Sequence, residues 1–420
     1  MSKTKNNNDH DIRMPGRRDF FKKSGAALLF MNFPLKHLLA DNYDPFSQAT
    51  PQSKYGDIFV MESPPGPETV LNGKRYVYFG GTGYFALQGH PDLIEAGVAA
   101  FRKYGVHPAT SRTGFGNNPV QLELESKIAE YFGTEDSLHF VSGYLDNLFQ
   151  VQALKDQIDV VFIDETAHFS IMDAVYSALK PVIKFRHRDP DDLEKKLEET
   201  LKPGQKPLLM TDGIFPTMGV IAPVPEYLKV IEPYNGFICL DDSHSVGVLG
   251  PNGRGTYDHY GIKSDRCFFA GTMSKAFGGH GGFIPGSKQF ITHIKTTCGA
   301  FAGATPSPTA AIAASLKGLE IVTQHPEMRD RLRKNVVMVK TGLKKLGFEM
   351  NDNPVPIATW TMKSAEDMKK IQKELLNRGV AVAYTKYVGA PASGALRASI
   401  FSEHKPEHIN KLLEEVGKLV

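Results

Sequence analysis

The chain has 420 residues, of which 41% are hydrophobic and 23% are charged, as in an ordinary soluble globular protein. This length predicts a large hydrophobic core and more than one domain. The net charge of +3 is too small to indicate a nucleic-acid partner.

The first 40 residues differ in character from the rest. Residues 16–22 have the sequence GRRDFFK, which resembles the twin-arginine export signal, and the apolar run 25–33 has the length of a signal-peptide core. That run is too short to cross a bilayer as a helix, so we expect no stable membrane span. We predict that residues 1–40 are an export signal and that the protein reaches the periplasm. The alternative is a basic amphipathic arm, packed on a partner subunit of a cytoplasmic protein.

The next segment, residues 41–90, contains turn signals and extended stretches such as GKRYVYFGG. From residue 91 to about residue 309, helical and strand patterns alternate. Helical spacing occurs at 121–133, which ends in Gly133, and at 144–155. Apolar strand patterns occur at 137–143, 159–165, 207–213, 236–242 and 266–272. This alternation predicts a large α/β domain, residues 91–309, with a mostly parallel sheet and helices on both faces.

The pattern changes after about residue 310. Helices are predicted at 308–324, 329–347, 364–379 and 405–420, and short strands at 357–362, 380–385 and 396–401. Helices mixed with short strands predict a smaller C-terminal α+β domain, residues 310–420.

Ligands of parallel α/β folds bind beyond the carboxyl ends of the strands, and polar residues of this chain collect there. At Ser142, Gly143 and Tyr144 a strand turns into a helix, whose free N–H groups would suit a phosphate. Many such turns bind nothing, so this signal is weak alone. His168 follows the strand at 159–165. Its ring could lie flat on an aromatic ligand, or it could be a surface or capping histidine.

Two carboxylates, Asp241 and Asp242, end the strand at 236–242. Adjacent carboxylates could bind a metal, but no further His, Asp or Glu cluster with ligand spacing follows, so we predict no metal site. A single carboxylate beneath a heteroaromatic nitrogen would instead keep that nitrogen protonated. His244, three residues after Asp241, could reach a ring hydroxyl. The scattered cysteines, Cys239, Cys267 and Cys298, are predicted to be buried thiols.

Lys275 follows the strand at 266–272 and lies in the glycine-rich stretch GTMSKAFGGHGG. Desolvation or a neighbouring positive charge would lower its pKa and free its lone pair for Schiff-base chemistry. The alternative for a lone lysine is a solvated loop residue. However, a phosphate cradle, a stacking ring, an acid and an imine-forming lysine each follow a strand, in that order. Together they describe a pyridoxal phosphate site.

The chain also resembles a known family. From about Tyr76 to the C-terminus it resembles the α-oxoamine synthases, which are fold-type-I pyridoxal phosphate enzymes. The motifs that carry the resemblance are HPDLIEAG, LELESKIAEYFG, TDGIF, DDSHSVGVLGPNGRG, GTMSKAFG and LRASIFSEHKPEHI. The resemblance implies the fold-type-I architecture and a homodimer with its active site between subunits.

By that resemblance, Lys275 would form a Schiff base with pyridoxal 5'-phosphate. Asp241 would pair with the pyridine nitrogen, His244 would contact the ring oxygen, and His168 would stack on the ring. These residues would form the catalytic centre, with Lys275 and His168 as candidates for proton transfer.

The resemblance assigns the outer parts of the site as well. Backbone groups of Gly143 and Tyr144, with Thr272, would contact the cofactor phosphate. Arg397 would bind the carboxylate of an amino-acid substrate, because a planar guanidinium can donate to both carboxylate oxygens.

The implied reaction condenses an amino acid with an acyl-CoA and releases CO2. Three places depart from the family pattern, namely Gly83, Pro216 and the turn at 302–304. Two alternatives therefore stay open. One is an aminotransferase of class I/II type on the same fold, and the other is a non-catalytic cofactor-binding or interaction protein.

Overall fold

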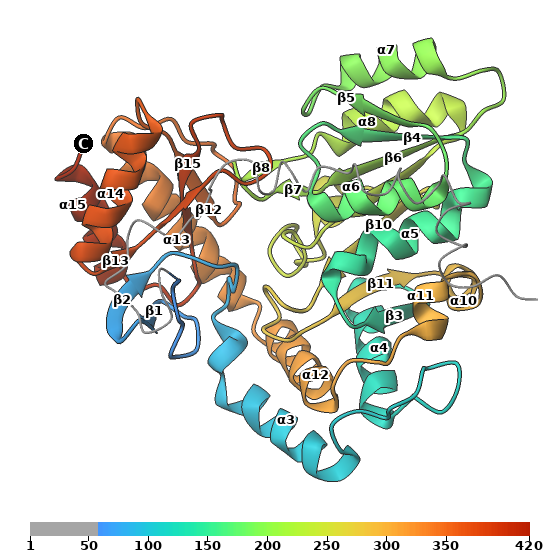
Figure 1. Cartoon of the computed structure of the whole chain (residues 1–420), viewed down its shortest axis with the longest axis horizontal. Helices are drawn as coiled ribbons and strands as arrows, with labels where there is room; N and C mark the ends of the chain where they lie inside the picture. The colour runs from blue at the N-terminus through green and yellow to red at the C-terminus, as the bar shows by residue number, and fades with distance from the viewer. Residues whose placement is uncertain (1–57) are drawn as a thin grey trace, which may run out of the picture. The chain divides into compact units, whose positions relative to one another are not determined.

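The computed structural model describes residues 58–420, and Figure 1 shows its helices and strands. The predicted export signal or basic arm, residues 1–40, lies outside the described residues, as does the stretch 41–57. Within the described part, no helix combines the length and apolar character needed to cross a membrane. Cys239 and Cys298 are buried free thiols, and Cys267 is a free thiol that is partly exposed.

The largest sheet has seven strands in the order β3-β11-β10-β9-β6-β4-β5. They are β3 (Asp136–Phe140), β4 (Val160–Asp164), β5 (Val182–Phe185), β6 (Pro207–Asp212), β9 (Phe237–Asp241), β10 (Cys267–Thr272) and β11 (Gly282–Gly286). From β10 to β5 all neighbours pair in parallel, whereas β11 is antiparallel to both of its neighbours. The predicted mostly parallel sheet is therefore confirmed, and β5 and β11 are strands that the sequence patterns did not predict.

Helices cover both faces of this sheet (Figure 1). One face holds α5 (Asp146–Leu154), α6 (Phe169–Val175) and α10 (Lys288–Thr297). The other holds α4 (Pro119–Phe132), α7 (Pro190–Thr200), α8 (Val224–Ile231), α9 (Thr256–Tyr260) and α12 (Thr309–Gln324). In β4, Val161 and Ile163 pack toward the first set, and Val160 and Phe162 pack toward the second. A strand buried on both faces must be apolar along its length, which is why its sequence predicts it.

The carboxyl ends of the central strands lie level with one another. Asp212, at the end of β6, lies opposite Asp241, at the end of β9, and Asp241 lies opposite Ala270 of β10. The residues that follow these strands are therefore brought together at one edge of the sheet.

The C-terminal part contains α13 (Glu327–Lys345), α14 (Ala365–Asn377) and α15 (Pro406–Gly417). They accompany an antiparallel sheet of β12 (Ile357–Trp360), β15 (Ala395–Ser399) and β14 (Ala383–Thr385). The stretch 380–385, predicted as one strand, forms two. β13 (Val380–Ala381) leaves this sheet and pairs with β2 (Lys74–Tyr78), which in turn pairs with β1 (Glu68–Leu71).

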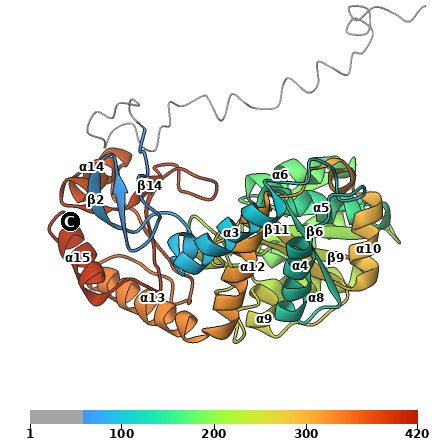
Figure 2. The ribbon, with the colours of Figure 1, turned by 90° about the horizontal axis from the view of Figure 1, so that it is seen from below.

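The N-terminal segment is thus joined to the C-terminal part by strand pairing. The domain boundaries near residues 90 and 310 stay predictions. Helix α3 (Pro91–Tyr104) packs along α12, and Figure 2 shows these two helices side by side.

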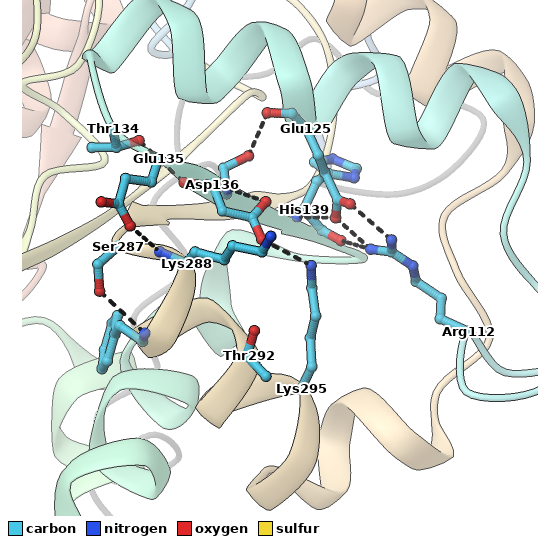
Figure 3. A network of polar contacts seen from close by, with 12 residues as sticks. Arg112, Glu125, Thr134, Glu135, Asp136, His139, Ser287, Lys288, Thr292 and Lys295 are labelled. Carbon is cyan, nitrogen blue, oxygen red and sulfur yellow. Dashed lines mark hydrogen bonds and ion pairs between the residues drawn. The ribbon is translucent and has the colours of Figure 1, made fainter.

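Buried polar contacts hold the loop before α4 against β3, an edge strand of the large sheet (Figure 3). The guanidinium of Arg112 donates to both carboxylate oxygens of Glu125, with 2.8 Å between Nη2 and Oε2. Arg112 also donates to the carbonyl oxygen of His139, whose N–H donates to Glu125 Oε1 at 2.8 Å. On the other side of the strand, Asp136 pairs with Lys295 of α10 at 3.5 Å. The loop, α4, β3 and α10 are therefore linked by charge.

Candidate active site

A cavity of about 150 Å³ lies beyond the carboxyl ends of the central strands. It is lined by Ser142, Gly143, Tyr144, His168, Ser170, Asp212, Asp241, Ser243, His244, Thr272, Ser274 and Lys275. All seven residues predicted to hold the cofactor are in this set. Arg397 lines an adjoining cavity of about 310 Å³, which shares His168, His244 and Lys275 with the first. The structure therefore brings every predicted site residue to two neighbouring cavities.

Asp241 is the last residue of β9 and accepts hydrogen bonds at both carboxylate oxygens. Its Oδ2 accepts from Nδ2 of Asn147 at 2.9 Å, and its Oδ1 accepts from the N–H of Ser243 at 3.1 Å. Burial raises the pKa of this carboxyl, but the positive charge of Lys275 and these hydrogen bonds outweigh burial and hold the pKa below its usual range. Asp241 is therefore a buried anion, suited to a protonated ring nitrogen.

His168 is the residue that caps the N-terminus of α6. Its Nδ1 accepts the N–H of Ser170 at 3.2 Å, and its Nε2 lies 2.6 Å from the hydroxyl of Tyr387. A backbone N–H can only donate, so Nδ1 is an acceptor in the neutral ring; the hydroxyl of Ser170, 2.7 Å away, donates to it as well, and the proton is on Nε2. Burial is the main influence on His168 and lowers its pKa, which favours this neutral form. The backbone N–H of His168 donates a hydrogen bond to Oδ2 of Asp212 at 2.9 Å, which fixes the main chain at His168.

Lys275 lies after β10, at the junction of the two cavities. Burial lowers the pKa of its ammonium, and the carboxyls of Asp241, Asp146 and Asp212 raise it without outweighing burial. A lowered pKa leaves more of the lysine as the free amine, which is the nucleophilic form. Burial therefore lowers the pKa of Lys275, as its sequence context predicts, and its role in imine formation stays a prediction.

His244 lies deep in the site and contacts a residue from the N-terminal segment. Its Nδ1 is 2.7 Å from the hydroxyl of Tyr84. Burial, with the positive charges of Lys275 and Arg397, holds the pKa of His244 well below its usual value. His244 is therefore a neutral hydrogen-bonding group.

The phosphate end of the cavity has the predicted strand–turn–helix form. β3 leads through a short 3₁₀ turn, Gly143–Leu145, into α5. A Cβ at Gly143 would lie only 2.8 Å from Cβ and Oγ1 of Thr272, so only glycine fits beside that threonine. The hydroxyls of Thr272 and Ser274 lie 2.8 Å apart. Helix N–H groups and two hydroxyls thus gather at one end of the cavity, as a phosphate requires.

Arg397 extends from β15 toward the second cavity. Its Nε donates to the carbonyl oxygen of Pro216 at 2.8 Å, and its Nη1 donates to Oγ of Ser399 at 2.9 Å. No carboxylate within residues 58–420 forms an ion pair with it. The guanidinium is therefore positioned by neutral acceptors and is available to a substrate carboxylate.

Five further residues belong to the site although sequence reasoning assigned them no role, namely Tyr84, Asn147, Ser170, Asp212 and Tyr387. Asp212 ends a predicted strand, so its position beside Asp241 could have been inferred from parallel pairing. Tyr387 lies between β14 and β15, far along the chain from His168, and no local pattern marks it.

The donor set fits pyridoxal 5'-phosphate. A phosphate cradle and an anionic carboxylate line one cavity, with a neutral imidazole and a lysine of lowered pKa between them. Gly143 leaves the space that the cradle needs. Within residues 58–420, no group of three or more His, Cys, Asp or Glu side chains is arranged to hold a metal ion.

Comparison with known proteins gives consistent matches. Residues 81–416 match the family described as aminotransferase class I and II. The 8-amino-7-oxononanoate synthase of Thermoanaerobacter pseudethanolicus is 33% identical over 368 residues, covering 87% of this chain and 93% of that protein. The 8-amino-7-oxononanoate synthase of Thermosipho melanesiensis is 33% identical over 369 residues, covering 88% and 94%. The structure of serine palmitoyltransferase from S. paucimobilis with a bound PLP–myriocin aldimine superposes with a TM-score of 0.82 at 27% identity, covering 95% of this chain and 98% of that one.

Proposed function

Since the chain belongs to the aminotransferase class I and II family and to its α-oxoamine synthase branch, we propose that it condenses an amino acid with an acyl-CoA thioester, with loss of CO2. Both the relatives and the donor set make it a pyridoxal phosphate-dependent transferase. The observation that carries the proposal is the placement of Arg397 beside Lys275, because an unpaired guanidinium next to the reactive amine suits a substrate that carries a carboxylate.

Each part of the cofactor has a matching part of the cavity. Gly143, Tyr144 and Thr272 would hold the phosphate, and Asp241 would keep the ring nitrogen protonated. His244 would contact the ring oxygen. When bound, pyridoxal phosphate supplies an electrophilic carbon for amines and a ring that accepts an electron pair.

The remaining groups act on the substrate. Arg397 binds and orients the amino-acid carboxylate, and the carbonyl oxygen of Pro216 fixes the guanidinium. Once its amine is released, Lys275 can accept and return a proton at Nζ, because burial lowers its pKa. His168, whose Nε2–H points to Tyr387, offers a second proton-transfer group.

We extend the proposal to assembly and location. We propose a homodimer, because the α-oxoamine synthases that the chain resembles are homodimers with the active site between subunits. We also propose that residues 1–40 direct export by the twin-arginine route, with a cytoplasmic protein as the alternative. Since acyl-CoA is a cytoplasmic substrate, export would favour a different acyl donor.

A direct assay tests the reaction. The holoenzyme is incubated with single amino acids and acyl-CoAs of increasing chain length, and free thiol and CO2 are measured together. We expect both products in equal amounts, and none from Lys275→Ala. The control is Lys288→Ala, which removes an exposed lysine at the start of α10 that lines neither active-site cavity (Figure 3). Exchange of amino groups with a keto acid, without thiol release from any thioester, would instead make the chain an aminotransferase.

A further inference from the structure

A third cavity lies apart from the candidate active site, among α4, α12, the first turn of α13 and the loop at 250–254. Its volume is about 540 Å³. It is lined by Lys127, Glu130, Tyr131, Asn252, Arg254, Leu319, Glu320, Thr323, Gln324 and Arg329. None of these residues lines either active-site cavity. Figure 2 shows α4 and α12 next to each other. Residues from both helices line the cavity.

The charges of this cavity do not cancel. Both carboxylates that line the cavity already form ion pairs with lysines. Glu130 pairs with Lys127 at 2.8 Å, and Glu320 pairs with Lys317, on α12. Two arginines, Arg254 and Arg329, remain. Within residues 58–420, neither guanidinium forms a hydrogen bond or an ion pair; for Arg254 only the backbone N–H is used, and it donates to Asp258 at 3.2 Å.

Arg329 is the residue that most strongly indicates a bound anion in this cavity. It is only 9% exposed, so its charge has lost most of its hydration. It lies in the first turn of α13, where the partial positive charge of the helix dipole adds to its own. The charge of Arg254 is better compensated, because its guanidinium lies against the carboxyl end of α4. A Cβ placed on Gly133, the residue at that end, would be 3.2 Å from Nη1 of Arg254. A buried guanidinium with neither anion nor carbonyl partner is costly unless an anion occupies the cavity.

Neutral groups complete the setting. Tyr131 donates its hydroxyl to the carbonyl oxygens of Asn252 and Gly253, both at 3.2 Å, and so holds the loop that carries Arg254. Burial raises the pKa of Tyr131 to about 12, so it adds no negative charge. The amide of Gln324 lies on the wall as a further donor.

We propose that this cavity binds a phosphate-bearing anion, held by the guanidinium groups of Arg329 and Arg254. A doubly charged phosphate group matches two arginines, and each planar fork can donate to two phosphate oxygens. The volume accommodates more than one phosphate group. The anion has two possible sources, a separate phosphate compound or the phosphates of the CoA thioester, and only the second source rests on the proposed function.

Calorimetric titration of the holoenzyme with pyrophosphate in chloride buffer tests the site. The holoenzyme is required because phosphate would otherwise compete for the cofactor cradle. We expect one site per chain, with affinity reduced about tenfold or more in Arg329→Gln. The matched control is Arg331→Gln on the same helix, whose arginine pairs with Glu403 at 2.9 Å and does not line the cavity; it should bind within about twofold of the wild type. If Arg329→Gln does not fold, Arg254→Gln takes its place.

Two further measurements identify the source of the anion. Displacement of pyrophosphate by adenosine 3',5'-bisphosphate, with a higher KM for acyl-CoA but not for the amino acid in Arg329→Gln, would assign the site to the CoA phosphates. An unchanged KM together with lost pyrophosphate binding would assign it to a separate phosphate compound. The proposal is overturned if millimolar pyrophosphate does not bind, if Arg329→Gln binds as the wild type does, or if Arg331→Gln loses as much affinity. Because binding is measured directly, these outcomes do not depend on whether the chain catalyses the condensation.

Discussion

The hydroxyl of Tyr387 lies 2.6 Å from Nε2 of His168, although the two residues are 219 positions apart in the chain. The proton of the neutral imidazole is on Nε2, since Nδ1 accepts the N–H of Ser170, so Tyr387 receives that proton's hydrogen bond. The ring of Tyr387 also packs edge-on against Phe169. Tyr387 therefore fixes the tilt of the ring that is predicted to stack on the cofactor.

Replacing this hydroxyl should slow the reaction without releasing the cofactor. In Tyr387→Phe the ring of His168 loses its hydrogen-bond partner at Nε2, and we expect kcat to fall about tenfold. This decrease is smaller than the decrease expected when a proton-transfer group itself is removed. The visible absorption of the bound cofactor should remain, with a shifted pH profile of kcat. The control is Tyr234→Phe, in the 3₁₀ turn Glu232–Tyr234 that precedes β9. An unchanged kcat and pH profile in Tyr387→Phe would remove Tyr387 from the mechanism.

The strands beside the site differ in how well their residues predict them. β4 and β9 are apolar along their length because both faces are buried, so their sequences indicate strands directly. β11 contains Gly282, Pro285 and Gly286, and proline is normally absent from central strands because it cannot donate to the ladder. Only the pairing of β11 with β3 and β10 makes it a strand, and that pairing depends on the whole fold.

The site residues also differ in how well the sequence predicts them. Lys275 and His168 follow strands and Asp241 ends one, so the rule that ligands lie at the carboxyl ends of parallel strands predicts that they lie near one another, and all three line one cavity. Tyr84 and Tyr387 come from segments that reach the site through the small sheets, so their contacts with His244 and His168 depend on tertiary structure. Residues held by long-range packing carry no local signal.

Arg397 should be needed for the amino acid and not for the thioester. Arg397→Lys keeps the charge but loses the planar fork, together with the donors to Pro216 and Ser399. We expect the KM for the amino acid to rise by about tenfold or more, and the KM for the acyl donor to change by less than about twofold. Steady-state kinetics with each substrate varied in turn would measure both. A parallel rise in both KM values would mean that Arg397 supports the fold of the pocket and does not bind the carboxylate.

The buried ion pair of Arg112 and Glu125 should matter for stability. Their side chains are 6% and 5% exposed, so Arg112→Ala leaves a carboxylate buried without its counter-charge (Figure 3). We expect a loss of about 3–5 kcal/mol in the free energy of unfolding, measured by urea denaturation. The control is Arg75→Ala, which breaks an exposed pair with Glu68 and should cost at most about 1 kcal/mol. Equal effects of the two variants would show that the buried pair contributes no more than an exposed one.

His404 should make stability depend on pH in mildly acid solution. It is 3% exposed, accepts the N–H of Phe401 at Nδ1 and faces the carbonyl oxygen of Tyr78 at Nε2, with both distances 3.0 Å. Burial lowers its pKa to about 3 in the folded chain. The pKa of an unfolded histidine is about 6.5. Above pH 6.5 both states are neutral and the full stability is present.

As the pH falls from 6.5 toward 3, the unfolded chain binds a proton that the folded chain does not, so His404 lowers the free energy of unfolding by about 1.4 kcal/mol per pH unit. His404→Gln removes this proton uptake. The variant should be less stable at pH 7, because a buried hydrogen-bonded ring is lost, but its stability should fall less steeply with acid. Urea midpoints measured between pH 4 and pH 7 would compare the two slopes. Parallel curves would show that His404 takes up its proton as readily in the folded chain as in the unfolded chain, which would contradict the buried neutral ring inferred from these contacts.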